Sequence, residues 1–215
     1  TQALVLEIRG RRTLQPKPMP RSPVRKAIRS VAVLPLENLT GRAEDEYFAD
    51  GMTEMLTTEL SGIGALRVVS RQSVRAFKGS DRPLRDVTDL RGVDAVLEGS
   101  VLRAGDRIRV VVQLVRVAPE EHLWAGAYDR EMRDVFAMYS EISRAVSMEV
   151  EAKLTGEEQR LLTERAHRSV HPVAYDRFLR GVALFDQNQF PDAVEQLRSA
   201  IEFEPDFAEA HAYIA

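Results

Sequence analysis

Apolar positions recur along the chain with two different periods, and the change of period divides the chain into two parts. Between residues 30 and 154, short β-rich apolar runs alternate with amphipathic stretches of helical period. The expected strands cover 31–36, 66–70, 93–102, 107–117 and 122–128, and the expected helices cover 44–60, 72–77, 84–90 and 134–154. The order β-α-β-α-α-β-β-β-α predicts an α+β domain whose mixed, α/β-like sheet is covered by helices, because crossovers come first and a meander follows.

Gly51 lies inside the expected helix 44–60, where a glycine costs about 1 kcal/mol relative to alanine. Close packing of this helix on the sheet is the expected reason. Residues 107–117 alternate between apolar and polar side chains, which predicts a half-buried antiparallel strand with one wet face.

From Ala174 onward only the helical period remains. Two apolar faces, at 175–185 and 190–201, are joined by a turn at 188–191, and Pro205 ends the second helix. Such a helical hairpin cannot bury its apolar side alone. Ala208 lies 34 residues after Ala174, so the same pattern begins a second time and stops at Ala215.

This hairpin resembles a tetratricopeptide repeat. The matching residues are those expected to pack within the repeat: Gly181, Ala193, Ala200 and Pro205. Leu184 and Leu197 replace the usual aromatic residues of the family and keep the apolar character. The resemblance implies one complete repeat, a truncated second one, and a surface that binds a protein partner.

The chain therefore divides into a basic linker at 1–29, the α/β domain at 30–154, a helical joint at 155–173 and the repeats at 174–215. Residues 1–30 hold eight basic side chains and one acidic one, whereas the rest of the chain is acidic. Four prolines make this arm an extended segment. We favour a solvated tether over a patch for acidic lipid or nucleic acid, because no aromatic side chain is available to stack on bases.

Four side chains are candidates for contact with a ligand or partner: Asn38, Arg71, Glu98 and Trp124. The first three would meet at the carboxyl ends of the parallel strands, where small ligands bind in open α/β sheets. Glu98 interrupts an apolar strand, so a ligand-contacting acid is one interpretation. A structural pair with Arg71 or Arg103 is the favoured one. Trp124 is interpreted as a sheet anchor, with a contact residue as the alternative.

The residues point to no catalytic chemistry. The chain has no cysteine, and no phosphate-binding glycine loop follows the first strand. No serine on a sharp glycine turn has a matching histidine and aspartate. His167 and His171 would share a helical face, but Pro172 adjoins them and no third metal ligand is near. We therefore expect no enzyme activity, no cofactor and no metal ion in this chain.

Residues 31–152 resemble the TolB amino-terminal-like (FlgO-like) α/β domain. The segments that carry the resemblance keep one order and spacing: 32–35 with Asn38, 47–51 with Glu54, 96–101, 107–114, 122–124 and 128–130. A departure at 119–121 affects a loop only. The resemblance implies a bacterial signalling protein with a cyclase, kinase or DNA-binding domain upstream of this chain.

The expected function is a non-catalytic regulatory module whose repeats contact a protein partner. The alternative is a small-ligand sensor with a pocket beside Asn38, Arg71 and Glu98. Nucleic acid is not expected as a partner. The location stays open between a cytoplasmic or membrane-tethered domain, with the tether upstream, and a periplasmic one, because the basic arm favours the cytoplasmic side and the family often lies outside it.

Overall fold

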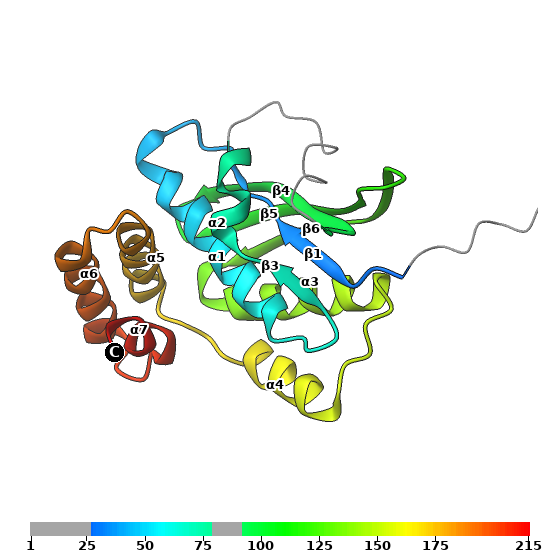
Figure 1. Ribbon diagram of the computed structural model, residues 1–215. Helices are drawn as coiled ribbons and strands as arrows, with labels where there is room; N and C mark the ends of the chain where they lie inside the picture. Colours follow the sequence, from blue (N-terminus) through cyan, green and yellow to red (C-terminus); the bar gives the residue numbers. More distant parts are fainter. Residues whose placement is uncertain (1–26, 79–91) are drawn as a thin grey trace, which may run out of the picture.

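A computed structural model describes residues 27–78 and 92–215 and shows a six-stranded mixed sheet followed by a helical region (Figure 1). The strand order is β3-β1-β4-β5-β6, and β2 pairs with the second half of β4. The strands are β1 (Ser30–Val33), β2 (Glu37–Asn38), β3 (Arg67–Val69), β4 (Ala95–Ala104), β5 (Arg107–Arg116) and β6 (Glu121–Glu131). β1 is parallel to β3 and β4, whereas β4, β5 and β6 form an antiparallel meander.

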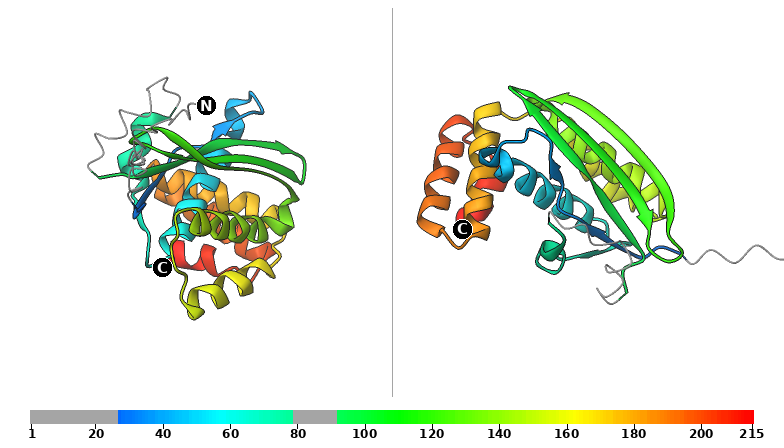
Figure 2. Two further views of the ribbon diagram at one scale, coloured as in Figure 1. Left: turned by 90° about the vertical axis from the view of Figure 1, so that its right-hand side faces the viewer. Right: turned by 90° about the horizontal axis from the view of Figure 1, so that it is seen from above.

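The helices of the first part are η1 (Ala43–Asp45), α1 (Glu46–Ser61), α2 (Arg71–Val74), η2 (Arg75–Phe77), η4 (Met132–Asp134) and α3 (Val135–Glu149). α1 and α3 lie side by side on one face of the sheet (Figure 2). α2 packs on the opposite face, where Val74 joins a small separate cluster with Ala32 and Val96. Successive residues of β1 alternate between the two clusters, as the period of a strand requires.

The second part consists of α4 (Gly156–Ala166), α5 (Pro172–Asp186), α6 (Phe190–Phe203) and α7 (Ala208–Ile214). α5 and α6 form an antiparallel hairpin, and α7 begins the next one (Figure 1). The sequence-based prediction of a mixed α/β sheet followed by a helical repeat is confirmed. The alternation of buried and exposed residues along most of β5 also agrees with the predicted half-buried strand.

Two of the predicted elements differ from the structure. The run 31–36 is not one strand, because β1 ends at Val33 and β2 starts at Glu37. The predicted helix 134–154 ends at Glu149, since Glu151 adopts a left-handed φ of 56° that no helix continues through. The expected helix 84–90 lies outside the described residues.

The main hydrophobic core extends from the α/β domain into the repeat without interruption. It holds residues of β1, β4, β5, α1 and α3 together with buried side chains of α5, α6 and α7. Helices α1 and α5 approach each other closely: a Cβ atom built on Gly51 would lie 2.8 Å from Cδ2 and 3.0 Å from Cβ of Leu179. The expectation that Gly51 packs on the sheet is therefore wrong, because its open side faces the repeat.

We expect Gly51→Val to lower the free energy of unfolding by about 1–3 kcal/mol, the usual cost of overpacking a filled site. Thermal or denaturant unfolding measures this loss. The matched control is Gly156→Val at the start of α4, where a Cβ atom would meet nothing within 4 Å. Equal effects of the two substitutions would contradict the close approach of α1 and α5.

Candidate functional site

The repeat is held together where α5 crosses α6. A Cβ atom on Gly181 would lie 2.7 Å from Cγ of Leu197 and 3.2 Å from the carbonyl oxygen of Ala193, so only a glycine fits this crossing. Ala193 and Ala200 are fully buried on α6. Pro205 lies in the turn that leads to α7, and it has no N–H with which to continue α6.

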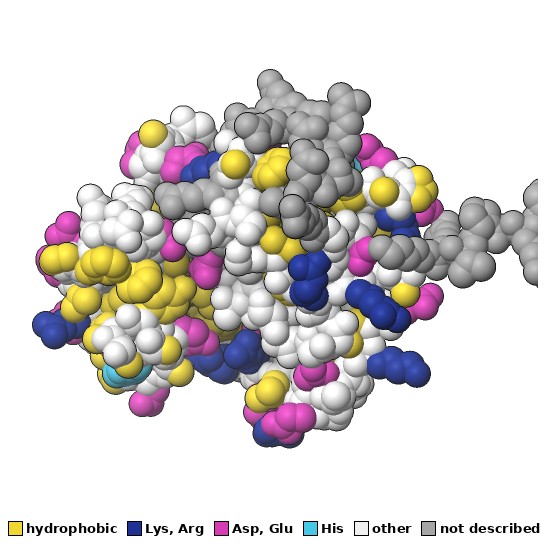
Figure 3. All heavy atoms as spheres, viewed as in Figure 1, with side chains coloured by type: hydrophobic (Ala, Val, Ile, Leu, Met, Phe, Trp, Pro, Cys, Tyr) yellow, Lys and Arg dark blue, Asp and Glu magenta, His cyan; other side chains and the backbone are white. Residues whose placement is uncertain are grey.

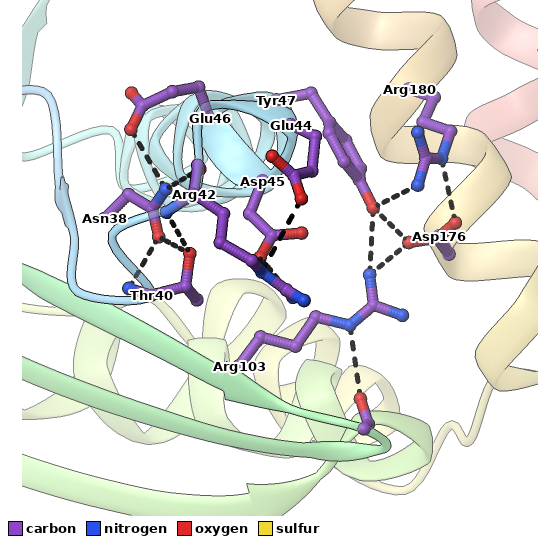
Figure 4. Close-up of polar contacts among 11 residues, drawn as sticks. Asn38, Thr40, Arg42, Glu44, Asp45, Glu46, Tyr47, Arg103, Asp176 and Arg180 are labelled. Atoms are coloured by element: carbon purple, nitrogen blue, oxygen red, sulfur yellow. Dashed lines mark hydrogen bonds and ion pairs between the residues drawn. The ribbon is translucent and has the colours of Figure 1, made fainter.

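A polar cluster lies where α1, β4 and α5 meet, and we take it with the repeat as the candidate functional site (Figure 4). The hydroxyl of Tyr47 on α1 donates to Asp176 on α5. The same hydroxyl accepts from Arg103 Nη1 and from Arg180 Nη2, each at 2.9 Å. Arg103 on β4 also forms an ion pair with Asp176, and Arg180 binds the second carboxylate oxygen at 3.0 Å.

The surroundings of this cluster shift the protonation of its members. Burial and the hydrogen bond to Asp176 raise the pKa of Tyr47 to about 12. Burial alone would also raise the pKa of Asp176. Hydrogen bonds from Tyr47, Arg103 and Arg180 outweigh that effect, and the pKa of Asp176 is lowered. The guanidinium of Arg180 stacks 4.0 Å above the ring of Tyr47, so all four side chains hold one another in place.

The segment between the two parts of the chain, at 155–173, also forms ion pairs with both of them. Arg165 on α4 forms an ion pair with the buried Glu59 on α1. Arg168 binds both oxygens of Glu209 on α7, at 2.7 and 3.0 Å, and its guanidinium lies 4.6 Å from the centre of the Phe136 ring. The segment predicted as a helical joint thus contacts α1, α3 and α7.

A further contact between the α/β domain and the repeat is fully buried. The hydroxyls of Tyr139 on α3 and Tyr175 on α5 lie 2.5 Å apart, and both side chains are almost fully enclosed. Phe136 packs edge-on against Tyr175 and Phe207. One of the two hydroxyls donates to the other, so each buried oxygen has a hydrogen-bond partner.

Asn38 is engaged within its own loop. Its Oδ1 accepts from the backbone N–H and the hydroxyl of Thr40, and its Nδ2 donates to the carbonyl of Arg42 and to Glu46 (Figure 4). This arrangement fixes the turn after β2 and the start of α1. Both hydrogen atoms of the amide group and its oxygen are therefore used inside the protein.

Of the remaining ligand candidates, Glu98 and Trp124 lie on opposite faces of the sheet. Glu98 accepts from Gln113 across the β4–β5 pair at 2.7 Å. Arg103 pairs with Asp176 and not with Glu98, whereas the alternative pair of Glu98 with Arg71 stays a prediction. The side chain of Arg71 lies outside the described residues. Trp124 packs against the main core from β6, over Gly126, at the far edge of the sheet from β1. Glu98 faces the side of the sheet opposite to Trp124. Side chains along β4 alternate between the two faces, and Leu97 and Val101 point into the main core.

Tyr47, Asp176 and Arg180 were not singled out from the sequence. The available signal was weak: Asp176 and Arg180 stand four residues apart and flank Leu179, which gives α5 a second, partly polar face. Such a pair is common on solvated helices, and only the fold shows that it faces α1.

His167 and His171 serve local structure. The ring of His167 contacts the carbonyl of Thr163, and Nδ1 of His171 accepts from the N–H of Val173 at the start of α5. Within 27–78 and 92–215, no three His, Asp or Glu side chains are placed to share a metal ion. None of the helices in these ranges has the length and apolar character to cross a membrane.

The repeat presents a group of exposed aromatic side chains. Phe185 at the end of α5 lies edge-on to Phe190 of α6, with 5.2 Å between ring centres, and to Tyr213 of α7, with 5.7 Å. Phe185 is 41% exposed and Phe190 47%. Figure 3 shows hydrophobic side chains gathered over this helical end of the molecule.

Comparisons with known proteins agree with this architecture. Residues 181–215 match the family described as TPR repeat, which confirms the predicted tetratricopeptide repeat. The chain is 38% identical over 203 residues to a protein of Rhizobium meliloti (strain 1021) named "Putative adenylate cyclase 3". The match covers 93% of this chain and 34% of that protein, so the chain spans about a third of the length of its relative.

Solved bacterial structures resemble the chain more distantly. TolB from Acinetobacter baumannii is 15% identical with a TM-score of 0.44, covering 61% of this chain and 31% of TolB. Lipoprotein GNA1162 from Neisseria meningitidis is 19% identical with a TM-score of 0.41, covering 59% of this chain and 99% of the lipoprotein. The LpoB C-terminal domain from Escherichia coli is 21% identical with a TM-score of 0.38, covering 49% and 84%.

Replacing Asp176 with Asn should lower the free energy of unfolding by about 2 kcal/mol at pH 7, because hydrogen bonds to charged groups contribute about 1.5–3 kcal/mol. Folding lowers the pKa of Asp176 below its ordinary value of 3.8. Its stabilising contribution is therefore present above pH 3.8 and is lost as the pH falls through the folded-state pKa. Denaturant titrations should show that the difference in unfolding free energy between wild type and Asp176→Asn becomes smaller as the pH is lowered.

The control for this substitution is Asp134→Asn. Asp134 is 46% exposed and lies 3.9 Å from Arg133, so its replacement should change the unfolding free energy little. A loss of unfolding free energy that is the same for both variants, or that grows at low pH, would show that ionised Asp176 does not stabilise the contact between α5 and the α/β domain.

Proposed function

We propose that this chain is a non-catalytic regulatory and interaction module of a larger signalling protein, and that its repeat receives a protein partner. The observation that carries the proposal is the shared core: the repeat rests on α1 and α3 and leaves its aromatic end, at Phe185 and Phe190, open to solvent. A repeat built in this way offers a surface to a partner while its other side is held by the α/β domain.

The relative named as an adenylate cyclase suggests the kind of output that such a module serves. We propose that cyclase chemistry, where the parent protein has it, lies outside these 215 residues. The polar side chains brought together by the fold support this view. Hydrogen bonds and an ion pair join Tyr47, Arg103 and Asp176 to one another where α1, β4 and α5 meet. The side chains of Asn38 and Glu98 are also hydrogen-bonded within the protein.

The first test is enzymatic. The purified chain, incubated with ATP and Mg²⁺ or Mn²⁺, should form no cyclic AMP, as measured by chromatography of the products against a no-protein control. Formation of cyclic AMP, or hydrolysis of ATP above that control, would overturn the non-catalytic assignment.

The second test concerns the partner surface. Cross-linking followed by mass spectrometry in the native host should identify proteins bound by the wild-type chain. Binding should be lost in Phe185→Ala/Phe190→Ala, because removing two aromatic anchors at an interface commonly weakens binding strongly. Val173→Ala is the matched control, since Val173 is exposed on the same helix at its opposite end. Partners that bind both variants equally would show that the aromatic end is not the contact surface.

A further inference from the structure

The edge of the sheet at β6 carries features that the proposed function does not use. β6 is the last strand in the sheet order, and it extends over 11 residues (Figure 2). Its pairing with β5 has one irregularity, between Leu114 and Val115, and the register from Trp124 to Glu131 is continuous. A long, regular edge strand presents a row of backbone groups that can pair with another strand.

The outward-facing residues of β6 follow from the hydrogen-bond pattern. The N–H of Met132 donates to the carbonyl of Asp106 at 2.7 Å, directly beyond the paired residues Arg107 and Glu131. Backbone groups of successive residues in a strand point to opposite sides. The even-numbered residues from Trp124 to Arg130 therefore bond to β5, and the odd-numbered ones, Ala125, Ala127 and Asp129, direct their N–H and C=O groups away from the sheet.

Proteins usually protect such an edge with charges, prolines or bulges. Residues 122–128 contain no proline and no acidic or basic residue other than His122. The ionised side chains of β6 are paired within the chain: Glu121 with Arg116, Asp129 with Arg107, Arg130 with Glu141, and Glu131 with Arg133. The middle of the strand is thus left without a charge that would repel another strand.

The middle of β6 is also self-complementary. Its sequence Trp124-Ala-Gly-Ala-Tyr128 is symmetric in character about Gly126. In an antiparallel pair of two copies related by a two-fold axis at Gly126, Ala125 faces Ala127 of the second copy and Trp124 faces Tyr128. The alanines belong to the outward-facing set, so each Ala125–Ala127 pair can exchange two backbone hydrogen bonds. Aromatic residues facing each other across strands are a favourable cross-strand pair.

We propose that β6 pairs antiparallel with β6 of a second copy of this chain, joining two sheets into one across a two-fold axis at Gly126. The self-complementary pattern favours a second copy over an unrelated peptide, because a closed two-fold interface requires one patch that fits itself. Trp124 and Tyr128 cover the position of the missing Gly126 side chain, where a Cβ atom would lie 2.6 and 2.9 Å from their rings. Both aromatic residues therefore lie beside the axis.

The absence of native cysteine makes the arrangement directly testable, since an introduced thiol is the only one in the chain. A mixture of Ala125→Cys and Ala127→Cys proteins, treated with a short bis-maleimide, should give a covalent dimer linking the two variants, identified by peptide mass spectrometry. Glu157→Cys, exposed on α4, is the control and should stay monomeric. Equal cross-linking of the control, or no cross-linking of the mixture, would overturn the proposal.

Sedimentation equilibrium gives an independent readout. The wild-type chain should reach twice its monomer mass as concentration rises, whereas Ala127→Pro should stay monomeric, because proline removes an outward N–H and leaves the bonds to β5. Ala127→Ser keeps that N–H and should still dimerise. Circular dichroism reports whether the proline variant is folded, and cross-linking decides the proposal if it is not. A wild-type chain that is monomeric at all concentrations would refute the pairing.

Discussion

The close approach of α1 and α5 at Gly51 and Leu179 is the contact on which the arrangement of the two parts depends. A repeat hairpin has two apolar sides, and one of them is normally covered by the preceding repeat. Here no repeat precedes it in the described chain, and α1 of the sheet domain takes that place. The absence of a side chain at residue 51 lets the two helices meet closely enough for Leu179 to enter the common core.

The polar cluster beside this contact determines how α5 sits on α1. An apolar contact alone tolerates rotation or sliding, because apolar burial has no preferred direction. Asp176 binds Arg180 on its own helix, but its bonds to Arg103 from the sheet and to Tyr47 from α1 depend on where α5 lies, and a rotated or shifted α5 would break them. The cost of leaving a half-buried carboxylate unpaired makes other placements unfavourable.

The sequence predicted the parts well and their relation poorly. Periodicity identified the meander of β4 to β6 and the hairpin of α5 and α6, because each depends on contacts between neighbours in sequence. The role of Gly51 and the partner of Arg103 depend on residues more than a hundred and more than seventy positions away, respectively, and no local pattern encodes such a pairing. The predicted end of the helix 134–154 was also wrong. The left-handed turn at Glu151 ends this helix, and no glycine or proline marks that turn in the sequence.

This relation bears on how the module can act. A tethered repeat would bind a partner in any orientation relative to the sheet domain. A repeat that is seated on α1, α3 and β4 through Leu179, Tyr175 and Asp176 would instead hold the proposed partner in one orientation. Any change that requires a different orientation must break the cluster at Asp176 and expose part of the common core. If the proposed partner binds the repeat, energetic coupling to the sheet domain would pass through the contacts between α5 and α1.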